Sequence, residues 1–258
     1  MTRLRQVRAI AVLTVLEAVR GRLLWLAVLV LLIGLALVEL LGALAITETR
    51  EVQGAILGSL LRLAAVVLTA LFVISSGVRD FNDKVVEIYL SLPLPRWGYY
   101  LGKLAGFSLW AVAVAVLFAA LPALIGRPDQ ALLWGLSLLA ELLLMVGASL
   151  LCLFSFSQVT AALAAVAGFY TLSRAIGAIQ LMAQGPFANP AELTDRAARW
   201  AVDGIAFILP DLYRFTPSEW LAYGNGTWAA LSEIALQTLV YLVLLAGAGL
   251  FDLYRKDL

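Results

Sequence analysis

The chain has 258 residues, of which 63% are hydrophobic and 14% are charged, with 18 basic and 17 acidic side chains. Soluble domains average about 45–50% apolar and 25% charged residues, so a water-soluble fold could not bury this much apolar surface. The near-zero net charge provides no global field for a nucleic-acid partner. The lack of histidine excludes Ser-His-Asp and Cys-His nucleophile pairs and imidazole metal sites. We therefore expect no catalytic and no metal-binding residues.

Long apolar runs recur along the whole chain. A bilayer core about 30 Å thick needs roughly 20 apolar helical residues, and these runs meet that length. They lack the alternation with a period of two that a membrane β-strand shows. We expect an all-α integral membrane protein with six transmembrane helices in a single domain over residues 1–258. The expected spans are 23–46, 60–78, 104–125, 132–156, 159–182 and 228–251.

Basic residues are shared unevenly between the two sides of this arrangement. With six spans both termini face one side, and that side also carries the loop 79–103 and most of the arginines and lysines. The positive-inside rule then predicts cytoplasmic termini, a cytoplasmic loop 79–103 and an extracytoplasmic segment 183–227. We expect the chain to lie in the inner (plasma) membrane of the cell.

The segment 1–22, before the first span, has the pattern of a surface helix. Ile10, Leu13, Leu16 and Val19 recur every three residues, with arginines elsewhere in the segment. A helix with this pattern lies in the plane of the membrane interface. We predict an N-terminal amphipathic interfacial helix.

The segment 183–227 carries two helix-start signals. Asn189-Pro190 is expected to begin one helix, with Trp200 on its apolar face. Thr216-Pro217-Ser218-Glu219 matches a capping box and predicts a second, short helix. We expect both helices to lie at the outer membrane interface.

The loop 79–103 is predicted to be organised. Asp80, Asp83 and Glu87 are three and four residues apart and would share one face of a helix. The prolines from Pro93 onward end that helix because proline lacks the amide proton and restricts the residue before it. The pattern predicts a short, stiff helix held at the membrane face.

The end of this loop resembles the permease subunits of the ABC-2 transporter family. There, an acidic residue, a leucine, a proline and a basic residue precede Tyr-x-Leu-Gly-Lys at the start of the third span. The matching positions are Glu87, Leu90, Pro93, Arg96, Tyr100, Leu101, Gly102 and Lys103. The resemblance implies an ABC-2, type V exporter-like transmembrane domain, whose loop forms a coupling helix that docks on a cytosolic ATPase. The residues that it assigns to coupling are Asp80, Asp83, Glu87, Ile88, Leu90, Pro93 and Arg96.

The energy source would lie on another subunit, because the chain lacks the G-x4-G-K-[ST] phosphate loop. The resemblance implies two copies of an ABC ATPase, which would carry the ATP and magnesium, and a second permease that is identical or related. It implies no enzyme activity and no bound cofactor for this chain, and export as its direction. Its remaining partner would be the lipid bilayer, without nucleic acid.

A second, shorter resemblance lies in the outer segment. Residues 209–214 contain Pro-x-Asp-x-Tyr-Arg. This stretch is similar to one in permeases from copper-enzyme maturation clusters, such as that of nitrous oxide reductase. That likeness implies a small species delivered outward for metallocofactor assembly.

Five charged residues fall inside the expected spans. A charge at a helix centre costs about 2.5–3.5 kcal/mol on insertion scales, so each needs a partner or water. Glu39 and Arg62 lie roughly 10 Å below the outer ends of their spans and could pair. Arg174 and Glu233 match in depth and are predicted to pair, whereas Glu141 stands alone nearer the midplane. These residues either form packing pairs or line a substrate path.

A glycine repeat opens the third span. Gly98, Gly102 and Gly106 are spaced by four residues. This spacing lets helices approach closely. We expect a packing surface, or a place where the coupling helix pivots against a neighbouring span.

Two other classes of function stay open. An ion-driven secondary transporter or channel would show internal repeats with broken helices, and no convincing repeat relates the two halves of the chain. A membrane-embedded enzyme would have to rely on carboxylates such as Glu141, because the chain has no histidine and one cysteine. The ABC permease is the function that the residues favour.

Overall fold

The computed structural model describes residues 3–44, 49–83, 95–156, 158–183 and 193–255, and the regular structure in these ranges is entirely helical. The long helices consist largely of leucine, valine and alanine runs, and except at the helix ends their backbone polar groups are satisfied within the same helix. The elements are α1 (Arg3–Arg20), α2 (Leu23–Leu44), α3 (Thr49–Asn82), α5 (Arg96–Ile125), α6 (Pro128–Ser155), α7 (Val159–Ala183), α8 (Leu193–Ile208), η1 (Leu212–Arg214), α9 (Ser218–Tyr223) and α10 (Trp228–Arg255).

Within these ranges six helices, α2, α3, α5, α6, α7 and α10, are long and apolar enough to cross a membrane. The predicted number and order of the spans are confirmed, and the chain is a multi-pass membrane protein. The second span is longer than predicted, because α3 runs over 34 residues and continues past the apolar run at both ends.

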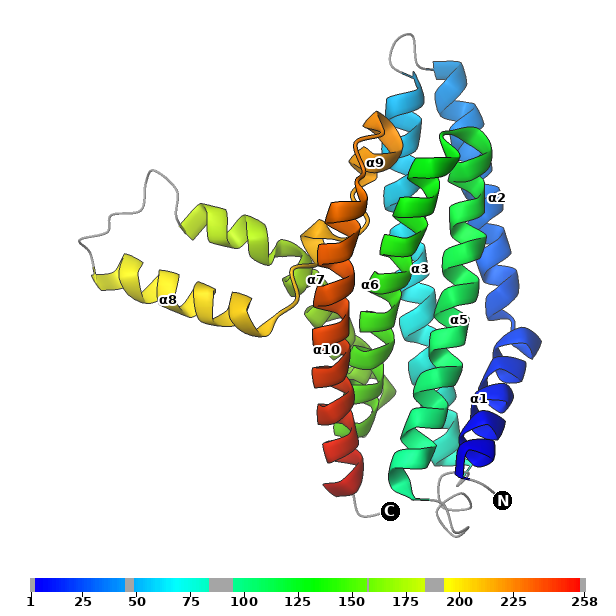
Figure 1. Cartoon of the computed structure of the whole chain (residues 1–258), viewed down its shortest axis with the longest axis vertical. Coiled ribbons are helices and arrows are strands. Elements are labelled where there is room, and N and C mark those ends of the chain that lie inside the picture. Colours follow the sequence, from blue (N-terminus) through cyan, green and yellow to red (C-terminus); the bar gives the residue numbers. More distant parts are fainter. Residues whose placement is uncertain (1–2, 45–48, 84–94, 157, 184–192, 256–258) are drawn as a thin grey trace.

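The start of α1 and the end of α10 lie at the same end of the helical bundle (Figure 1). We call this the terminal end and the opposite one the far end. The helix α6 occupies the centre of the bundle and is the most buried of the six spans. It packs against α3, α5, α7 and α10, so these helices are arranged around it.

The first part of α7 lies in the bundle beside α6, whereas its last part and α8 form a hairpin that projects from the side of the bundle (Figure 1). Gln180 on α7 donates a hydrogen bond to Asp203 on α8. The end of α8 is tied back to α10, because the Tyr241 hydroxyl donates to the carbonyl of Leu209 at 2.9 Å. Trp200, which was expected on an apolar face at the membrane interface, is 80% exposed on this hairpin.

The predicted N-terminal helix is present as α1, but its contacts differ from the expected pattern. The small residues Ala11, Thr14 and Ala18 are buried, whereas Leu13 and Leu16 are exposed. The buried face packs against the first half of α5. A Cβ added at Gly102 would lie 2.8 Å from Ile10, and one at Gly106 would lie 2.6 Å from Thr14. The glycine repeat is therefore a packing surface, at least at Gly102 and Gly106, and its partner is α1 and not a neighbouring span.

The segment after α8 turns back into the bundle. Leu212 and Phe215 are fully buried and Trp220 nearly so. The short helix η1 contacts α7, and α9 packs against α3 and α6. The predicted helix after Thr216 exists, but the capping box is wrong. The residue before α9 is Pro217, which makes no side-chain cap, and the Thr216 hydroxyl bonds elsewhere.

Candidate functional site

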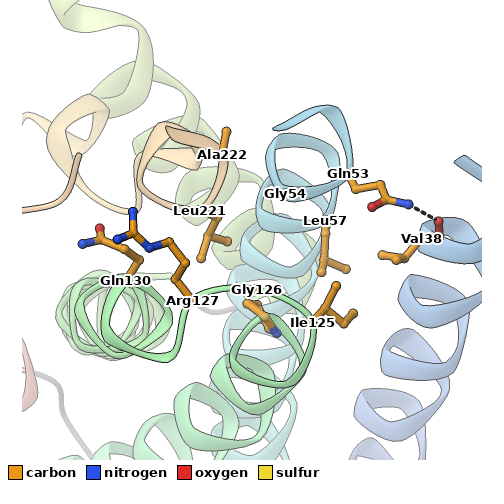
Figure 2. Close-up of a pocket in the computed structure, with 11 residues that line it drawn as sticks. Val38, Gln53, Gly54, Leu57, Ile125, Gly126, Arg127, Gln130, Leu221 and Ala222 are labelled. Carbon is orange, nitrogen blue, oxygen red and sulfur yellow. Dashed lines mark hydrogen bonds between the residues drawn. The ribbon is translucent and has the colours of Figure 1, made fainter. Parts of the chain in front are cut away.

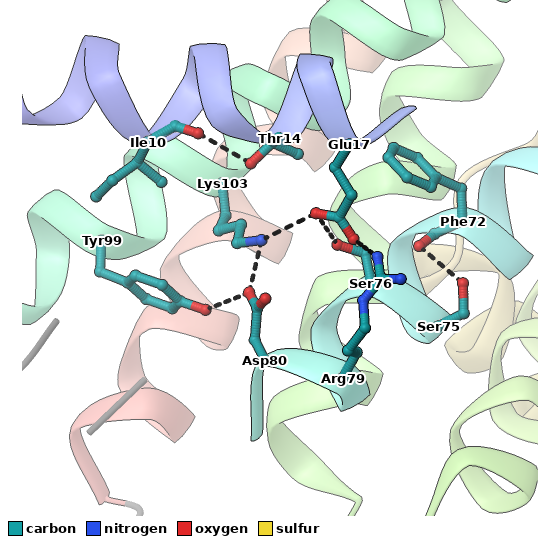
Figure 3. A network of polar contacts seen from close by, with 10 residues as sticks. All are labelled: Ile10, Thr14, Glu17, Phe72, Ser75, Ser76, Arg79, Asp80, Tyr99 and Lys103. Atoms are coloured by element: carbon teal, nitrogen blue, oxygen red, sulfur yellow. Dashed lines mark hydrogen bonds and ion pairs between the residues drawn. The ribbon is translucent and has the colours of Figure 1, made fainter. Parts of the chain in front are cut away.

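An ion pair at the terminal end joins α3 to α5 (Figure 3). The Lys103 Nζ lies 2.6 Å from Asp80 Oδ2, and these side chains are only 7% and 11% exposed. The Tyr99 hydroxyl donates to the same carboxylate oxygen at 3.1 Å. Asp80 lies in the last turn of α3, and Lys103 lies two turns into α5. The pair therefore fixes the two helix ends that flank the loop 84–94.

A second carboxylate brings α1 into this arrangement. Glu17 forms an ion pair with Arg79 and accepts a hydrogen bond from Ser76 at 3.0 Å, so α1 is bonded to α3. The Glu17 oxygen that accepts from Ser76, Oε2, also lies 3.9 Å from Lys103 Nζ. Together these side chains join three helices (Figure 3). We call them the terminal network, and they are Glu17, Ser76, Arg79, Asp80, Tyr99 and Lys103.

The structure corrects the predicted start of the coupling segment. Asp80 was expected to be an exposed acid of that segment, but it is buried inside α3 and paired with Lys103. The helix α3 ends at Asn82, and α5 already begins at Arg96, so Lys103 belongs to a span. The reason is that α3 and α5 both extend beyond their apolar runs.

The remaining predicted coupling residues divide into two groups. Asp83 is an exposed turn residue directly after α3. Arg96 opens α5 and donates to the carbonyls of Leu253 and Tyr254, which lie in the last turn of α10. Such an arginine satisfies helix-end carbonyls. Four residues assigned to coupling lie outside the described ranges, namely Glu87, Ile88, Leu90 and Pro93.

A cavity of about 530 Å³ opens beside the terminal network, at the junction between α1 and α2. Its walls include Glu17 and Arg79, together with Arg20 and Arg22 from the junction itself. Asp83, at the start of the loop, also lines it. The cavity therefore adjoins the same three-helix junction that flanks the loop.

A separate polar cluster lies in the interior around Glu141. This carboxylate on α6 is fully buried and accepts a hydrogen bond from the Thr216 hydroxyl. The backbone amide of Thr216 donates to Ser137 Oγ at 2.8 Å. Thr216 adopts a φ of 45°, a left-handed conformation that is unfavourable for a β-branched residue. These two bonds hold the returning segment in that conformation.

Two arginines complete this cluster. Arg174 on α7 approaches Glu141 Oε1 at 3.5 Å and donates to the carbonyls of Leu212 at 2.6 Å and Phe215 at 3.0 Å. Arg62 on α3 donates to the carbonyl of Thr216 at 3.3 Å. We call Arg62, Ser137, Glu141, Arg174 and Thr216 the Glu141 cluster. It joins three spans to the segment between α8 and α9.

Both predicted intramembrane pairs are wrong. Arg174 pairs with Glu141, which is therefore not alone, while Glu233 lies at the surface 3.7 Å from Arg214. Glu39 is exposed on α2, and the hydrogen bond of Arg62 goes to a backbone carbonyl instead. Matching side chains by their depth along the spans did not identify the partners, because the rotation of each helix decides which side chains meet.

A smaller cavity lies near the far end, between α2, α3, α9 and the turn from α5 to α6 (Figure 2). Its volume is about 210 Å³. Leu57 and Ile125 supply apolar walls, and Arg127 and Gln130 supply polar groups. The Gln53 amide donates to the Val38 carbonyl at 2.8 Å across it, linking α3 to α2. The sequence reading did not single out these residues.

Glu17 and Thr216 are the important residues that the sequence reading missed. Glu17 is the one acid in the arginine-rich segment 1–22, and this contrast was the available signal. The sequence predicted Thr216 as a helix cap. Its hydroxyl instead donates to Glu141, a contact that depends on the tertiary fold and has no local sequence signal.

No protein-family model matches the chain, and no match is found among curated proteins. The class that the fold itself defines is that of a multi-pass, all-helical membrane protein.

Proposed function

We propose that this chain is the membrane-spanning permease subunit of an ATP-binding cassette transporter of the ABC-2 type. In this proposal the segment between α3 and α5 docks on a separate cytosolic ATPase, and the termini face the cytoplasm. Two ATPase copies and a second permease complete the transporter, and the substrate leaves the cell. The ATP and magnesium belong to the ATPase.

The observation that carries the proposal is that the residues which resemble those of ABC-2 permeases contact other helices of the bundle. Lys103 pairs with Asp80 on α3, and Gly102 lets α1 approach α5. Tyr100 packs against Gly249 on α10, where an added Cβ would lie 2.8 Å from its hydroxyl. The motif therefore joins the start of α5 to three other helices. A force applied to the adjoining loop would reach all of them together.

The position of the terminal network supports the same mechanism. Its charged groups lie on α1, α3 and α5, and the Lys103–Asp80 pair among them is buried, so this bond is poorly screened by salt. Packed elements of this kind move as a unit. Displacement of the loop by an ATPase would shift α1 and the inner ends of both spans as one body.

The test is a double substitution in the loop, Glu87→Ala with Ile88→Ala. The tagged full-length chain is purified from its native membrane into nanodiscs, and the copurified ATPase and its hydrolysis rate are measured. We expect normal insertion of the variant, with loss of ATPase association and of permease-dependent hydrolysis.

A matched control removes an acid and an isoleucine from the projecting hairpin, Asp203→Ala with Ile205→Ala. Ile205 is 43% exposed, so this variant should keep both ATPase association and hydrolysis. Unchanged association and hydrolysis in the loop variant would contradict the proposal. So would the absence of any Walker-motif ATPase from the purified wild-type complex.

A further inference from the structure

An apolar groove runs between α3 and α7 on the outside of the bundle. Its volume is about 350 Å³. Met145 of α6 contributes to its buried floor, whereas Leu63, Val67 and Leu71 of α3 are 54%, 47% and 38% exposed at its rim. On α7 it extends from Leu163 to Thr171. The groove therefore opens sideways, toward the space that lipid chains occupy around a membrane helix.

The groove itself is lined by apolar residues with Tyr170 and Thr171, and two arginines lie just beyond one of its ends. Arg62 directly precedes Leu63, and Arg174 follows Thr171 by one helical turn, so both lie at the same end. Arg62 donates to the carbonyl of Thr216 and Arg174 to that of the adjacent Phe215, so the two guanidinium groups lie close together beside Glu141. Two cations face one carboxylate there, since the other acceptors are backbone carbonyls and hydroxyls. One positive charge is left without a counter-charge in the cluster.

Arg62 also has hydrogen-bond donors that make no hydrogen bond to the described residues. It makes one hydrogen bond, to the Thr216 carbonyl, and its buried Nε has no partner among the described residues. A guanidinium group presents five donors and binds phosphate or carboxylate in a two-point arrangement. The terminal nitrogens of Arg62 are the donors that an anionic acceptor at this end would use, because Nε itself is buried.

We propose that this groove binds an anionic amphiphile, with its phosphate or carboxylate head at Arg62 and its apolar tail along Leu63, Val67 and Leu71. The rim from Leu63 to Leu71 spans about 12 Å of helix, enough for much of an alkyl chain. As a binding site the groove stands apart from the proposed transport function. Only the interpretation that the bound amphiphile is a transported substrate rests on the proposed transport function.

The test uses the full chain alone in phosphatidylcholine nanodiscs, so that no ATPase enters the result. The probe is a phosphatidic acid with a diazirine in one acyl chain, present at low mole fraction, and adducts are mapped by peptide mass spectrometry. We expect adducts concentrated on residues 63–71 and 163–171. Arg62→Gln should lower them about tenfold, the loss of a charge-assisted hydrogen bond, and Arg62→Lys should lower them less.

A second variant tests the tail independently of the head. Val67→Trp fills the groove from an exposed position, so it should abolish labelling while leaving the fold intact. Leu124→Trp places the same ring on the 84% exposed Leu124, outside the groove, and Arg214→Gln removes an arginine that is 63% exposed. Both controls should label like the wild type.

Three outcomes would overturn the inference. Adducts spread evenly over exposed apolar positions such as Leu124 and Leu181 would mean bulk lipid only. Equal labelling by a phosphatidylcholine probe would remove the role of the anionic head. Competition by inorganic phosphate that abolishes labelling would show a site for a bare anion, without a contribution from the apolar groove.

Discussion

Lys103 on α5 and Asp80 on α3 form a buried ion pair, with 2.6 Å between Nζ and Oδ2. The two residues stand on either side of the loop that we propose as the coupling element. Their bond ties α3 to α5 beside the two helix ends that flank this loop. The first prediction follows from this pair.

Lys103→Met should destabilise the protein by about 3 kcal/mol, because it leaves a buried carboxylate without its cation. Asp80→Asn in the same chain should restore much of that loss, since the uncompensated charge is then gone. The measurement is the midpoint of chemical unfolding in detergent. As a control, Arg214→Met breaks the solvent-accessible pairs of Arg214 with Asp211 and Glu233, and each of these should contribute less than about 1 kcal/mol. Equal costs for the two single changes would contradict a structural role for the buried pair.

Thr216→Val should lower the unfolding free energy by about 1–3 kcal/mol, because Glu141 loses a hydrogen-bond donor in a fully buried position. Thr216→Ser retains the hydroxyl and should stay close to the wild type. Thr171→Val is the control, since the exposed Thr171 hydroxyl bonds only to carbonyls of its own helix. Thermal unfolding followed by size-exclusion chromatography measures all three. The assignment fails if the valine variants at 216 and 171 behave alike.

Gly106→Ala should cost about 1–3 kcal/mol, because the added Cβ would meet Thr14 at 2.6 Å and the backbone oxygen of Ala11 at 3.0 Å. The contact joins α1 to α5, so the N-terminal helix should also become more accessible to protease. Gly247→Ala is the control, since nothing lies within 4 Å of a Cβ there. Rates of proteolysis near residue 20 that match in both variants would argue against this contact.

The proposed orientation predicts opposite labelling of two single cysteines. In a Cys152→Ala background, Asp83→Cys should react with a membrane-impermeant maleimide only after the cells are opened. Trp200→Cys, on the exposed hairpin, should react from outside. The basic residues near the termini and the loop predict this orientation under the positive-inside rule. Labelling of Asp83→Cys in intact cells would reverse the topology.

The sequence predicted the spans well because each apolar run carries its own signal over about 20 residues. It predicted α1 as a helix, yet only part of the face by which α1 packs: Ile10 is buried as the pattern predicts, but the rest of that face consists of small residues, and Leu13 and Leu16 are exposed. The sequence did not predict which charged side chains pair inside the membrane. Arg174 meets Glu141 and not Glu233 because the rotation of α7 and the return of the segment 209–217 decide the contact, and neither has a local signal.

The central position of α6 has a consequence for how the protein is made. One side of α6 is covered by α10, where Leu242 and Leu245 close over Gly147. The helix α10 leaves the ribosome after the other five spans described here, so during synthesis α6 presents this glycine-containing face to lipid until α10 emerges. Faces with small residues readily accept another helix. A chain stopped before residue 228 would therefore display an open seam along its middle helix, which the membrane quality-control machinery can recognise as unfinished.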